Sequence, residues 1–195
     1  MRDVKFLPWV GKNYNDGLNG RRILVLGESH YCDESEATAD ITNRVMEKYL
    51  TKPNGHEAWM NTFKKFERAL VGFETTPEDS EKIWNSVSFY NFIQRPIGDT
   101  RIAGTKEDYL KGEKPFFKVL NELQPGYIVV WGSRLYENMP YTNWTERETV
   151  LVDGGTHITG TYRLKNSHDV NVISTYHPSA AFDWHYWHKV LETWW

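Results

Sequence analysis

Cysteine is almost absent from this sequence, and long apolar runs are absent altogether. Cys32 is the only cysteine among 195 residues, so the chain can form no intramolecular disulfide and cannot supply several thiolates to a zinc site or an iron–sulfur cluster. The longest wholly apolar runs, 23–26 and 127–131, have the length of strands and are too short to span a bilayer. The N-terminus also lacks the basic and apolar regions of a secretory signal. We therefore expect a cytoplasmic protein with no membrane segment.

Charge and aromatic content set broad limits on function. With 23 Lys and Arg against 26 Asp and Glu, the formal net charge is -3, which argues against unspecific coating of a polyanion but permits a local basic groove. Aromatic residues are abundant (9 Trp, 11 Tyr and 9 Phe), so we expect an aromatic core or a surface on which flat ligands stack. The length suits one domain that spans residues 1–195.

Apolar runs and helical periodicity alternate along the chain. The predicted strands are residues 23–26, 87–93, 127–131 and 170–175. The predicted helices are residues 34–50, 57–71, a short helix from Pro77, residues 107–123 with breaks near Gly112 and Pro115, and a last helix from about Ala181. This alternation predicts an α/β fold in three α/β/α layers, with a central, mostly parallel four-stranded sheet. Residues 149–152 and 160–164, on either side of Asp-Gly-Gly, predict a small hairpin in addition.

Polar motifs accompany three of the predicted strands. Residues 27–31 read Gly-Glu-Ser-His-Tyr, Asn91 lies within the apolar second strand, and residues 177–179 read His-Pro-Ser. The carboxyl ends of parallel strands share one edge of a sheet, where ligands bind in α/β folds. A residue before proline is held in an extended conformation, so we expect His177 to point into the same cleft. Each motif alone also fits a structural role, with Glu28 as a helix cap, His30 and His177 as core histidines and Asn91 as a buried strut.

Together and in this order, these segments resemble the uracil-DNA glycosylase superfamily. Glu28 matches the Glu of the Gly-Glu-Ala-Pro-Gly motif in the iron–sulfur branch, and Tyr31 matches the Tyr of the Gly-Gln-Asp-Pro-Tyr-His motif in the most familiar branch. Residues 91–96 (Asn-Phe-Ile-Gln-Arg-Pro) are similar to the Asn-to-Arg-Pro stretch of the iron–sulfur branch, and residues 129–132 are similar to its third strand. The resemblance covers residues 21–187, and His-Pro-Ser is its most specific motif.

The resemblance implies a monofunctional DNA glycosylase, a hydrolase that cleaves the N-glycosidic bond of uracil or another deaminated base flipped out of DNA. It implies that Glu28 orients or deprotonates a water and that His177 donates a hydrogen bond to the leaving base. The implied substrate-binding residues are Gly27, Ser29, His30, Tyr31, Asn91, Gly132 and Ser179. The implied wedge position lies within residues 180–182, with Ala180 and Phe182 as its candidates. Apart from the resemblance, Arg95, Arg101 and Lys106 form a candidate basic rim that binds phosphate beside the cleft. The partner is single- or double-stranded DNA containing a damaged base, and no metal or other cofactor is expected.

Three departures from the family pattern leave other functions open. Ser29 stands where the familiar branch has its water-activating Asp, and His30 stands where the family has Pro. No Phe follows Glu28 to stack on the base, which leaves Trp59 or Tyr31 for that contact. The first alternative is a catalytically inactive glycosylase-fold module that binds nucleic acid or a protein partner. The second is a hydrolase of the erythromycin-esterase type with Glu28 and His30 as catalytic partners, which gives His177 no role.

Overall fold

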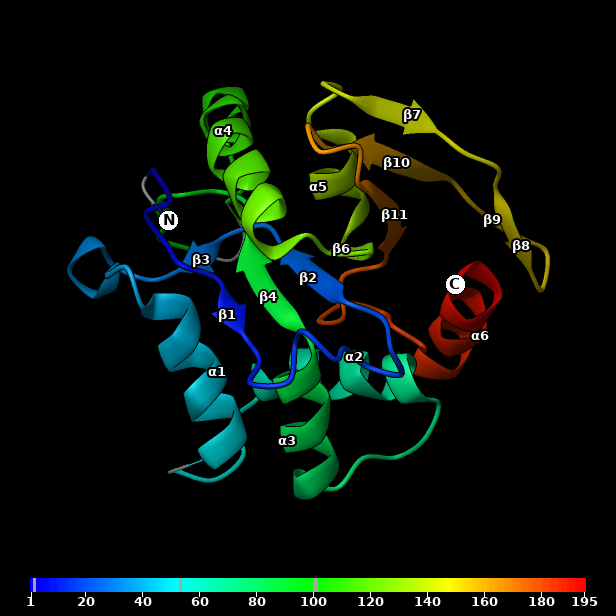
Figure 1. The fold of residues 1–195 in the computed structure, drawn as a ribbon. Helices are drawn as coiled ribbons and strands as arrows, with labels where there is room; N and C mark the ends of the chain where they lie inside the picture. Colours follow the sequence, from blue (N-terminus) through cyan, green and yellow to red (C-terminus); the bar gives the residue numbers. More distant parts are fainter. Residues whose placement is uncertain (2, 53, 100–101) are drawn as a thin grey trace.

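The computed structural model, which describes residues 1, 3–52, 54–99 and 102–195, is built around a seven-stranded mixed sheet (Figure 1). Four neighbouring strands pair in parallel, and three strands at the two sides pair antiparallel with them or with one another. In sheet order the strands are Trp9–Val10 (β1), Ser88–Asn91 (β4), Ile23–Gly27 (β2), Tyr127–Trp131 (β6), Asp169–Thr175 (β11), Thr159–Arg163 (β10) and Trp144–Glu146 (β7). The prediction of a four-stranded, mostly parallel sheet is therefore wrong.

The sheet is larger than predicted because its outer strands carry weak sequence signals. β1 has two residues and β7 has three, which is too short to show an alternating apolar pattern. β10, the predicted hairpin partner of residues 149–152, instead pairs antiparallel along β11, with Thr159 opposite Ile173. The hairpin forms between Val150–Val152 (β8) and Gly155–His157 (β9), directly across the Asp-Gly turn.

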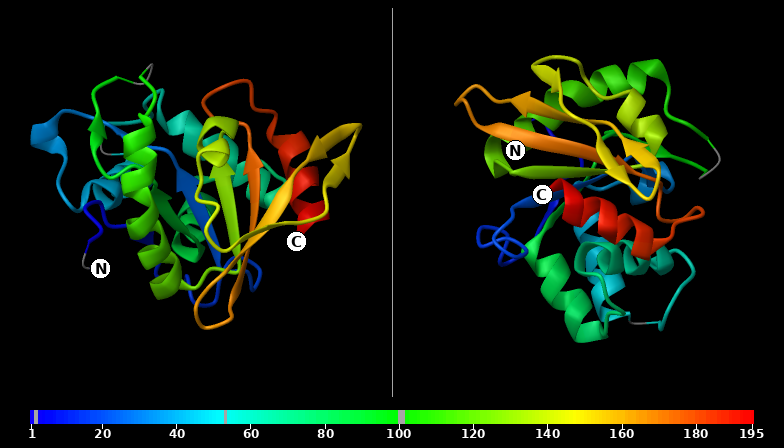
Figure 2. Two further views of the ribbon diagram at one scale, coloured as in Figure 1. Left: turned by 90° about the horizontal axis from the view of Figure 1, so that it is seen from above. Right: turned by 90° about the vertical axis from the view of Figure 1, so that its right-hand side faces the viewer.

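Helices cover both faces of the sheet, as the right-hand view in Figure 2 shows. In β2, Ile23 and Val25 belong to the apolar cluster on one face of the sheet, whereas Leu24 and Leu26 belong to the cluster on the other face. This division follows from the two-residue period of a strand. The helices are Ile41–Thr51 (α1), Met60–Val71 (α2), Pro77–Ser86 (α3), Lys106–Leu123 (α4), Ser133–Glu137 (α5) and Trp184–Trp194 (α6). None of the helices in the described part of the chain has the length and apolarity needed to cross a membrane.

Two predicted helices differ from the observed ones. Residues 34–50 were expected as one helix, but a 3-10 turn, Glu34–Glu36, precedes α1, which begins only at Ile41. The predicted breaks near Gly112 and Pro115 do not occur, since α4 runs unbroken from Lys106 to Leu123. A Cβ atom at Gly112 would lie 2.5 Å from the Phe92 ring, so this glycine allows α4 to pack closely on the end of β4.

A buried carboxylate connects the helices on the α2 face. Glu67 is fully buried in α2 and accepts hydrogen bonds from side chains of α1, α3 and the α2–α3 connection. A buried carboxylate is tolerated only when such partners replace its hydration. Its donors are Tyr49 Oη at 2.7 Å, Thr75 Oγ1 at 2.5 Å, Ser80 Oγ at 2.6 Å and Trp84 Nε1 at 2.9 Å, with Lys64 Nζ as a salt-bridge partner at 3.2 Å.

Candidate functional site

The carboxyl ends of β4, β2, β6 and β11 meet at one edge of the sheet. In the left-hand view of Figure 2, β6 and β11 point toward the top of the picture, where the connection to α6 rises above the sheet. Register places Gly27 opposite Asn91 and Trp131 opposite Thr175, so the residues that follow these strands start from adjacent positions. The edge therefore brings together Asn91, the Gly27–Glu28 turn, Gly132 and His177, which is the candidate site.

Glu28 is held on the α4 side of this edge by an arginine and a tyrosine. Arg134 donates from Nε to Oε1 at 2.9 Å and to Oε2 at 3.1 Å, and its Nη2 also donates to Oε2. Tyr109 donates its hydroxyl proton to Oε1. Burial raises the pKa of Tyr109, and the adjacent Glu28 raises it further, so the tyrosine stays protonated as a donor. Both carboxylate oxygens thus have protein donors.

The Glu28–Arg134 pair is asymmetric in its exposure. The Glu28 side chain is 8% exposed, whereas that of Arg134 is 48% exposed. The hydrogen bonds to Glu28 are the main reason that the pKa of Arg134 is raised above its usual value. Because the guanidinium remains charged and forms several bonds to one carboxylate, it fixes the direction of the Glu28 side chain.

His177 has a defined tautomer. The Ser179 backbone N–H donates to Nδ1 of His177 at 3.2 Å, and Ser179 Oγ lies 2.7 Å from the same nitrogen. Nδ1 is therefore an acceptor, and the proton of the neutral ring is on Nε2. Burial lowers the pKa of His177, the Glu28 carboxylate opposes this lowering, and the Arg134 guanidinium adds to it. Among the described side chains and backbone, no hydrogen-bond partner lies at Nε2.

Aromatic and glycine residues shape the wall around His177. The His177 ring lies edge-on to the Trp131 ring with centroids 5.9 Å apart. Gly132 has φ 97°, a conformation that favours glycine, and a Cβ atom there would lie 3.6 Å from Cβ of His177. The Gly132 N–H also donates to the Thr175 carbonyl at 2.9 Å. The backbones of β6 and β11 thus hold the histidine close to the strand ends.

Asn91 and His30 form a separate buried network. The Asn91 amide nitrogen lies 3.1 Å from Nε2 and 3.3 Å from Nδ1 of His30, and Thr42 Oγ1 lies 2.9 Å from Nε2. Burial lowers the pKa of His30 to about 4, so the ring is neutral at pH 7. The ring also packs edge-on against Phe6 at 5.4 Å. Asn91 therefore already has a protein partner, and His30 contributes a packed, neutral ring to the core.

Three buried polar atoms beside the strand ends have no hydrogen-bond partner in the described part of the chain. They are Ser29 Oγ, Tyr90 Oη and Trp131 Nε1. Ser29 follows Glu28, and Trp131 ends β6 with its ring against His177. An unpaired buried donor costs about 1–3 kcal/mol, so each of these groups calls for a specific explanation, such as a bound water or a role at the site.

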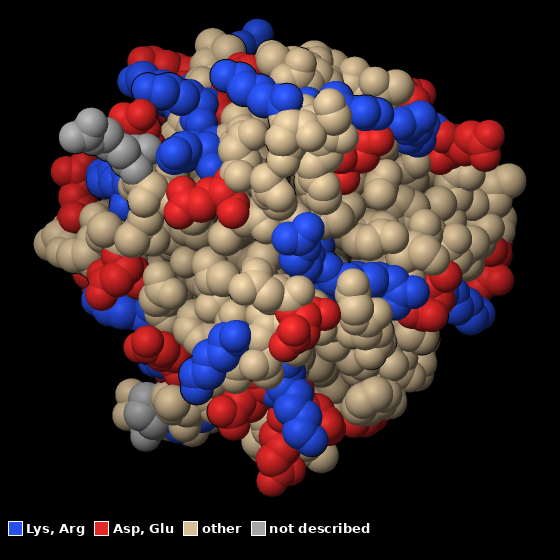
Figure 3. All heavy atoms as spheres, viewed as in Figure 1, with Lys and Arg blue, Asp and Glu red and all other residues tan. Residues whose placement is uncertain are grey.

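The residues expected to contact DNA differ in their exposure and in the partners they already have. Arg95 is paired through Nε and Nη2 with Asp108 at 2.5 and 2.7 Å, so its charge is already compensated. Phe182 is 7% exposed and lies parallel to the Trp187 ring at 5.9 Å, so it would have to leave the core to act as a wedge. Arg101 lies outside the described residues. Tyr31 (39% exposed), Lys106, Ser179 and Ala180 are exposed. Figure 3 shows basic and acidic side chains intermixed on the face it presents.

Two residues of the site, Arg134 and Tyr109, were not predicted from the sequence. Arg134 lies on the five-residue helix α5, and Tyr109 lies in the second turn of α4. Both are far from Glu28 along the chain and follow no motif. A charged residue placed just after the Trp131-Gly132 strand end was the one available clue to Arg134, since ligands and their partners gather at such ends.

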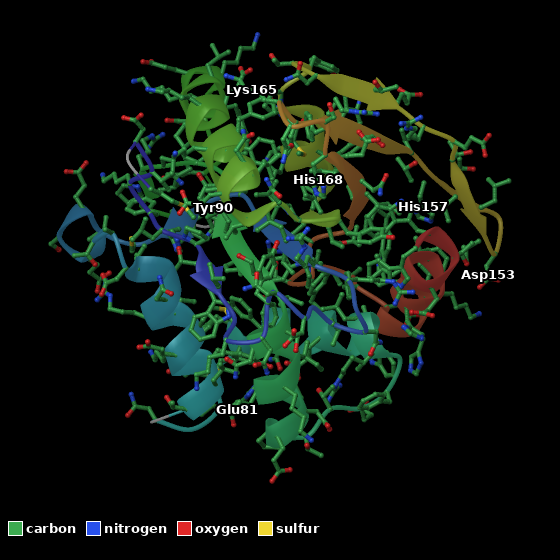
Figure 4. All side chains as sticks on the ribbon, in the orientation of Figure 1. Glu81, Tyr90, Asp153, His157, Lys165 and His168 are labelled. Atoms are coloured by element: carbon green, nitrogen blue, oxygen red, sulfur yellow. The ribbon has the colours of Figure 1, made fainter. Side chains whose placement is uncertain are left out.

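The described residues offer no group of three or more His, Cys, Asp or Glu side chains that could hold a metal ion. A groove of about 390 Å³ lies between α4 and the segments around Asn143 and Lys165. Lys165 marks its position in Figure 4. Neither Glu28 nor His177 lines that groove, so the candidate site rests on its side-chain arrangement and not on a large cavity.

Comparison with known proteins finds no family model and no curated protein that matches this chain.

Proposed function

We propose that this protein hydrolyses the N-glycosidic bond of uracil or another deaminated base flipped out of DNA. The observation that carries the proposal is the orientation of His177, whose Nε2 has no hydrogen-bond partner among the described residues and which follows β11 at the same sheet edge as the Glu28–Arg134 pair. A donor that follows β11 and a carboxylate that follows β2 lie at the same edge of the sheet, with β6 between the two strands. Such a pair suits a bond that breaks with negative charge on one side and positive charge on the other. We also propose that the protein is cytoplasmic, because its single cysteine can form no intramolecular disulfide.

Glu28 would act on the sugar side of the bond. As C1′ separates from the base nitrogen, the bonding electron pair stays with the base and positive charge builds on the sugar. An ionised carboxylate stabilises this charge and orients a water whose hydroxyl bonds to C1′, while the remaining proton ends on the base. Arg134 and Tyr109 fix the position of the Glu28 carboxylate through their hydrogen bonds. In this reaction the direction of the Glu28 side chain toward the sugar is what the two hydrogen-bond donors secure.

His177 would act on the base side of the bond. The neutral ring donates its Nε2 proton in a hydrogen bond to a carbonyl oxygen of the base, which gains negative charge as the bond breaks. A single preorganised donor of this kind contributes about 3 kcal/mol. Deaminated bases carry carbonyl oxygens that such donors can satisfy.

The test is an excision assay on labelled oligonucleotides that contain uracil, hypoxanthine or xanthine, in single-stranded and duplex form. Abasic sites are detected by strand cleavage in alkali. We expect excision by the wild-type chain, loss of most of it in Glu28→Gln, and a loss of about 100-fold or more in His177→Ala. Glu146→Gln and His56→Ala are the matched controls. Both residues are exposed; Glu146 lies on the edge strand β7, and His56 lies in the connection between α1 and α2.

A non-catalytic module that binds nucleic acid or a protein is the second candidate. It is favoured by the contacts of Glu28, since Arg134 and Tyr109 use both carboxylate oxygens and compete with a water for them. Binding of DNA without excision of any tested base, unchanged in Glu28→Gln, would support this module and contradict the hydrolase. Excision that is lost in both site variants and kept in both controls would exclude it.

A further inference from the structure

An exposed aromatic ring lies next to the candidate site. Tyr176 directly precedes His177 at the end of β11 and is 63% exposed. Its ring contacts the ring of Trp187, which is 3% exposed, edge-on with centroids 5.3 Å apart. One side of the tyrosine therefore rests on a fixed partner, while much of the ring faces outward.

The support beneath Tyr176 is built from several segments. Trp187 on α6 also contacts His157 of β9 at 5.0 Å and Phe182 at 5.9 Å. His157 Nε2 lies 2.8 Å from Tyr186 Oη, which joins the β8–β9 hairpin to α6. Figure 4 shows His157 beside α6 and Asp153 at the tip of the hairpin. Asp153 receives a salt bridge from Lys189 of α6 at 2.9 Å.

Hydrogen bonds also hold the backbone around Tyr176. Thr175 Oγ1 donates to the Tyr176 carbonyl at 3.0 Å, and the Ala180 N–H donates to the His177 carbonyl at 2.9 Å. A ring fixed both by its backbone and by a buried neighbour loses little conformational freedom when a flat ligand stacks on it. A large exposed ring with this support is suited to stacking.

We infer that Tyr176 is a stacking platform for a nucleobase next to the target nucleotide, and that the strand it prefers is single-stranded DNA. The inference rests on the proposed function, because the neighbouring base comes within reach only if the target base enters the site beside His177. In a duplex the adjacent bases stack on one another, whereas in a single strand they can turn a face to an aromatic side chain. Stacking reads no base edge, so Tyr176 sets strand preference and not sequence preference.

The test measures binding without chemistry. The probe is a single-stranded oligonucleotide with a tetrahydrofuran abasic analogue at the target position and the fluorescent base 2-aminopurine on its 5′ or its 3′ side. Stacking of 2-aminopurine on an aromatic ring lowers its fluorescence. Dissociation constants are measured for the wild-type chain, Tyr176→Leu, Tyr176→Phe and the control Tyr141→Leu, which changes an 80% exposed tyrosine elsewhere. The same probes are also tested as duplexes.

We expect quenching on one side of the analogue in the wild-type chain and in Tyr176→Phe. Tyr176→Leu should lose the quenching and bind the single strand about 5- to 150-fold more weakly, the range for one stacked base, with a smaller change for the duplex. An unchanged dissociation constant in Tyr176→Leu, or no binding of any probe by the wild-type chain, overturns the inference. Tyr176-dependent binding together with no excision of any base contradicts the hydrolase alone and leaves the stacking platform standing.

Discussion

Arg134 donates to both carboxylate oxygens of Glu28, although the two residues are 106 positions apart in the chain. Glu28 is the buried member and Arg134 the half-exposed one. The pair therefore joins α5 to the turn after β2, and each residue depends on the other for a different reason. Glu28 needs a donor because it is desolvated, and Arg134 needs an anchor because its long side chain is otherwise free to move.

Removal of the arginine should expose this dependence. We expect Arg134→Met to lower the free energy of unfolding by about 1–3 kcal/mol, because it leaves a buried carboxylate with Tyr109 as its remaining donor; the exposure of Arg134 keeps the loss below that of a fully buried pair. Urea unfolding at pH 7 measures the change. Arg163→Met is the control, since that arginine pairs with Asp169 at an exposed position. Equal losses in the two variants would contradict a special role for the Glu28 pair.

His30 predicts a dependence of stability on pH. Its pKa is about 4 in the folded chain and about 6.5 when unfolded, so above pH 6.5 the ring is neutral in both states. Between pH 6.5 and 4 the unfolded chain takes up a proton that the folded chain does not, and stability falls by about 1.4 kcal/mol per pH unit. His30 should thus remove about 2 kcal/mol between pH 7 and pH 5.

The measurement is urea unfolding of the wild-type chain and His30→Gln at several pH values. The variant should be less stable at pH 7 but should lose less stability on acidification, because glutamine does not titrate. His56→Gln, which changes an exposed histidine bound to Asn61, should keep the slope of the wild-type chain. Parallel pH profiles for the wild-type chain and His30→Gln would show that His30 takes up its proton equally in both states.

Glu67 should be among the residues most sensitive to substitution. Replacement by Ala leaves Tyr49, Ser80 and Trp84 with buried donors that lose a shared acceptor, and we expect a loss of about 3–5 kcal/mol in the free energy of unfolding. Glu74→Ala, which removes an exposed partner of Arg68, should cost less than about 1 kcal/mol. Thermal and urea unfolding compare the two. A mild effect of Glu67→Ala would mean that water replaces the carboxylate.

Gly27 should tolerate a side chain only if Asn91 changes with it. A Cβ atom at position 27 would lie 2.2 Å from Oδ1 of Asn91 and 3.2 Å from the Phe89 ring. We expect Gly27→Ala to cost about 1–3 kcal/mol and the double variant Gly27→Ala/Asn91→Ala to cost less than the sum of the two single changes. Urea unfolding measures these losses. If they are additive, the contact between positions 27 and 91 is not the cause of the cost of Gly27→Ala.

Much of the central sheet can be deduced from local sequence. The apolar runs that end at Gly27, Asn91 and Gly132 place polar residues at strand ends, because a buried strand stops where the chain needs a turn. The edge strands could not be deduced in this way. β1 and β7 have only two and three residues, and the pairing of β10 with β11 depends on a neighbour already in place and not on the pattern of β10 itself.

The sequence by itself determined which residues stand at the carboxyl ends of the strands, since a strand's length and its two-residue period are local properties. Only the tertiary structure decided what those residues contact. Glu28 meets Arg134 and Tyr109, Asn91 meets His30, and Phe182 turns into the core because packing brings distant segments together and desolvates them. Tertiary packing determines which groups hydrogen-bond to a buried polar side chain, and these partners determine the chemistry that the side chain can perform.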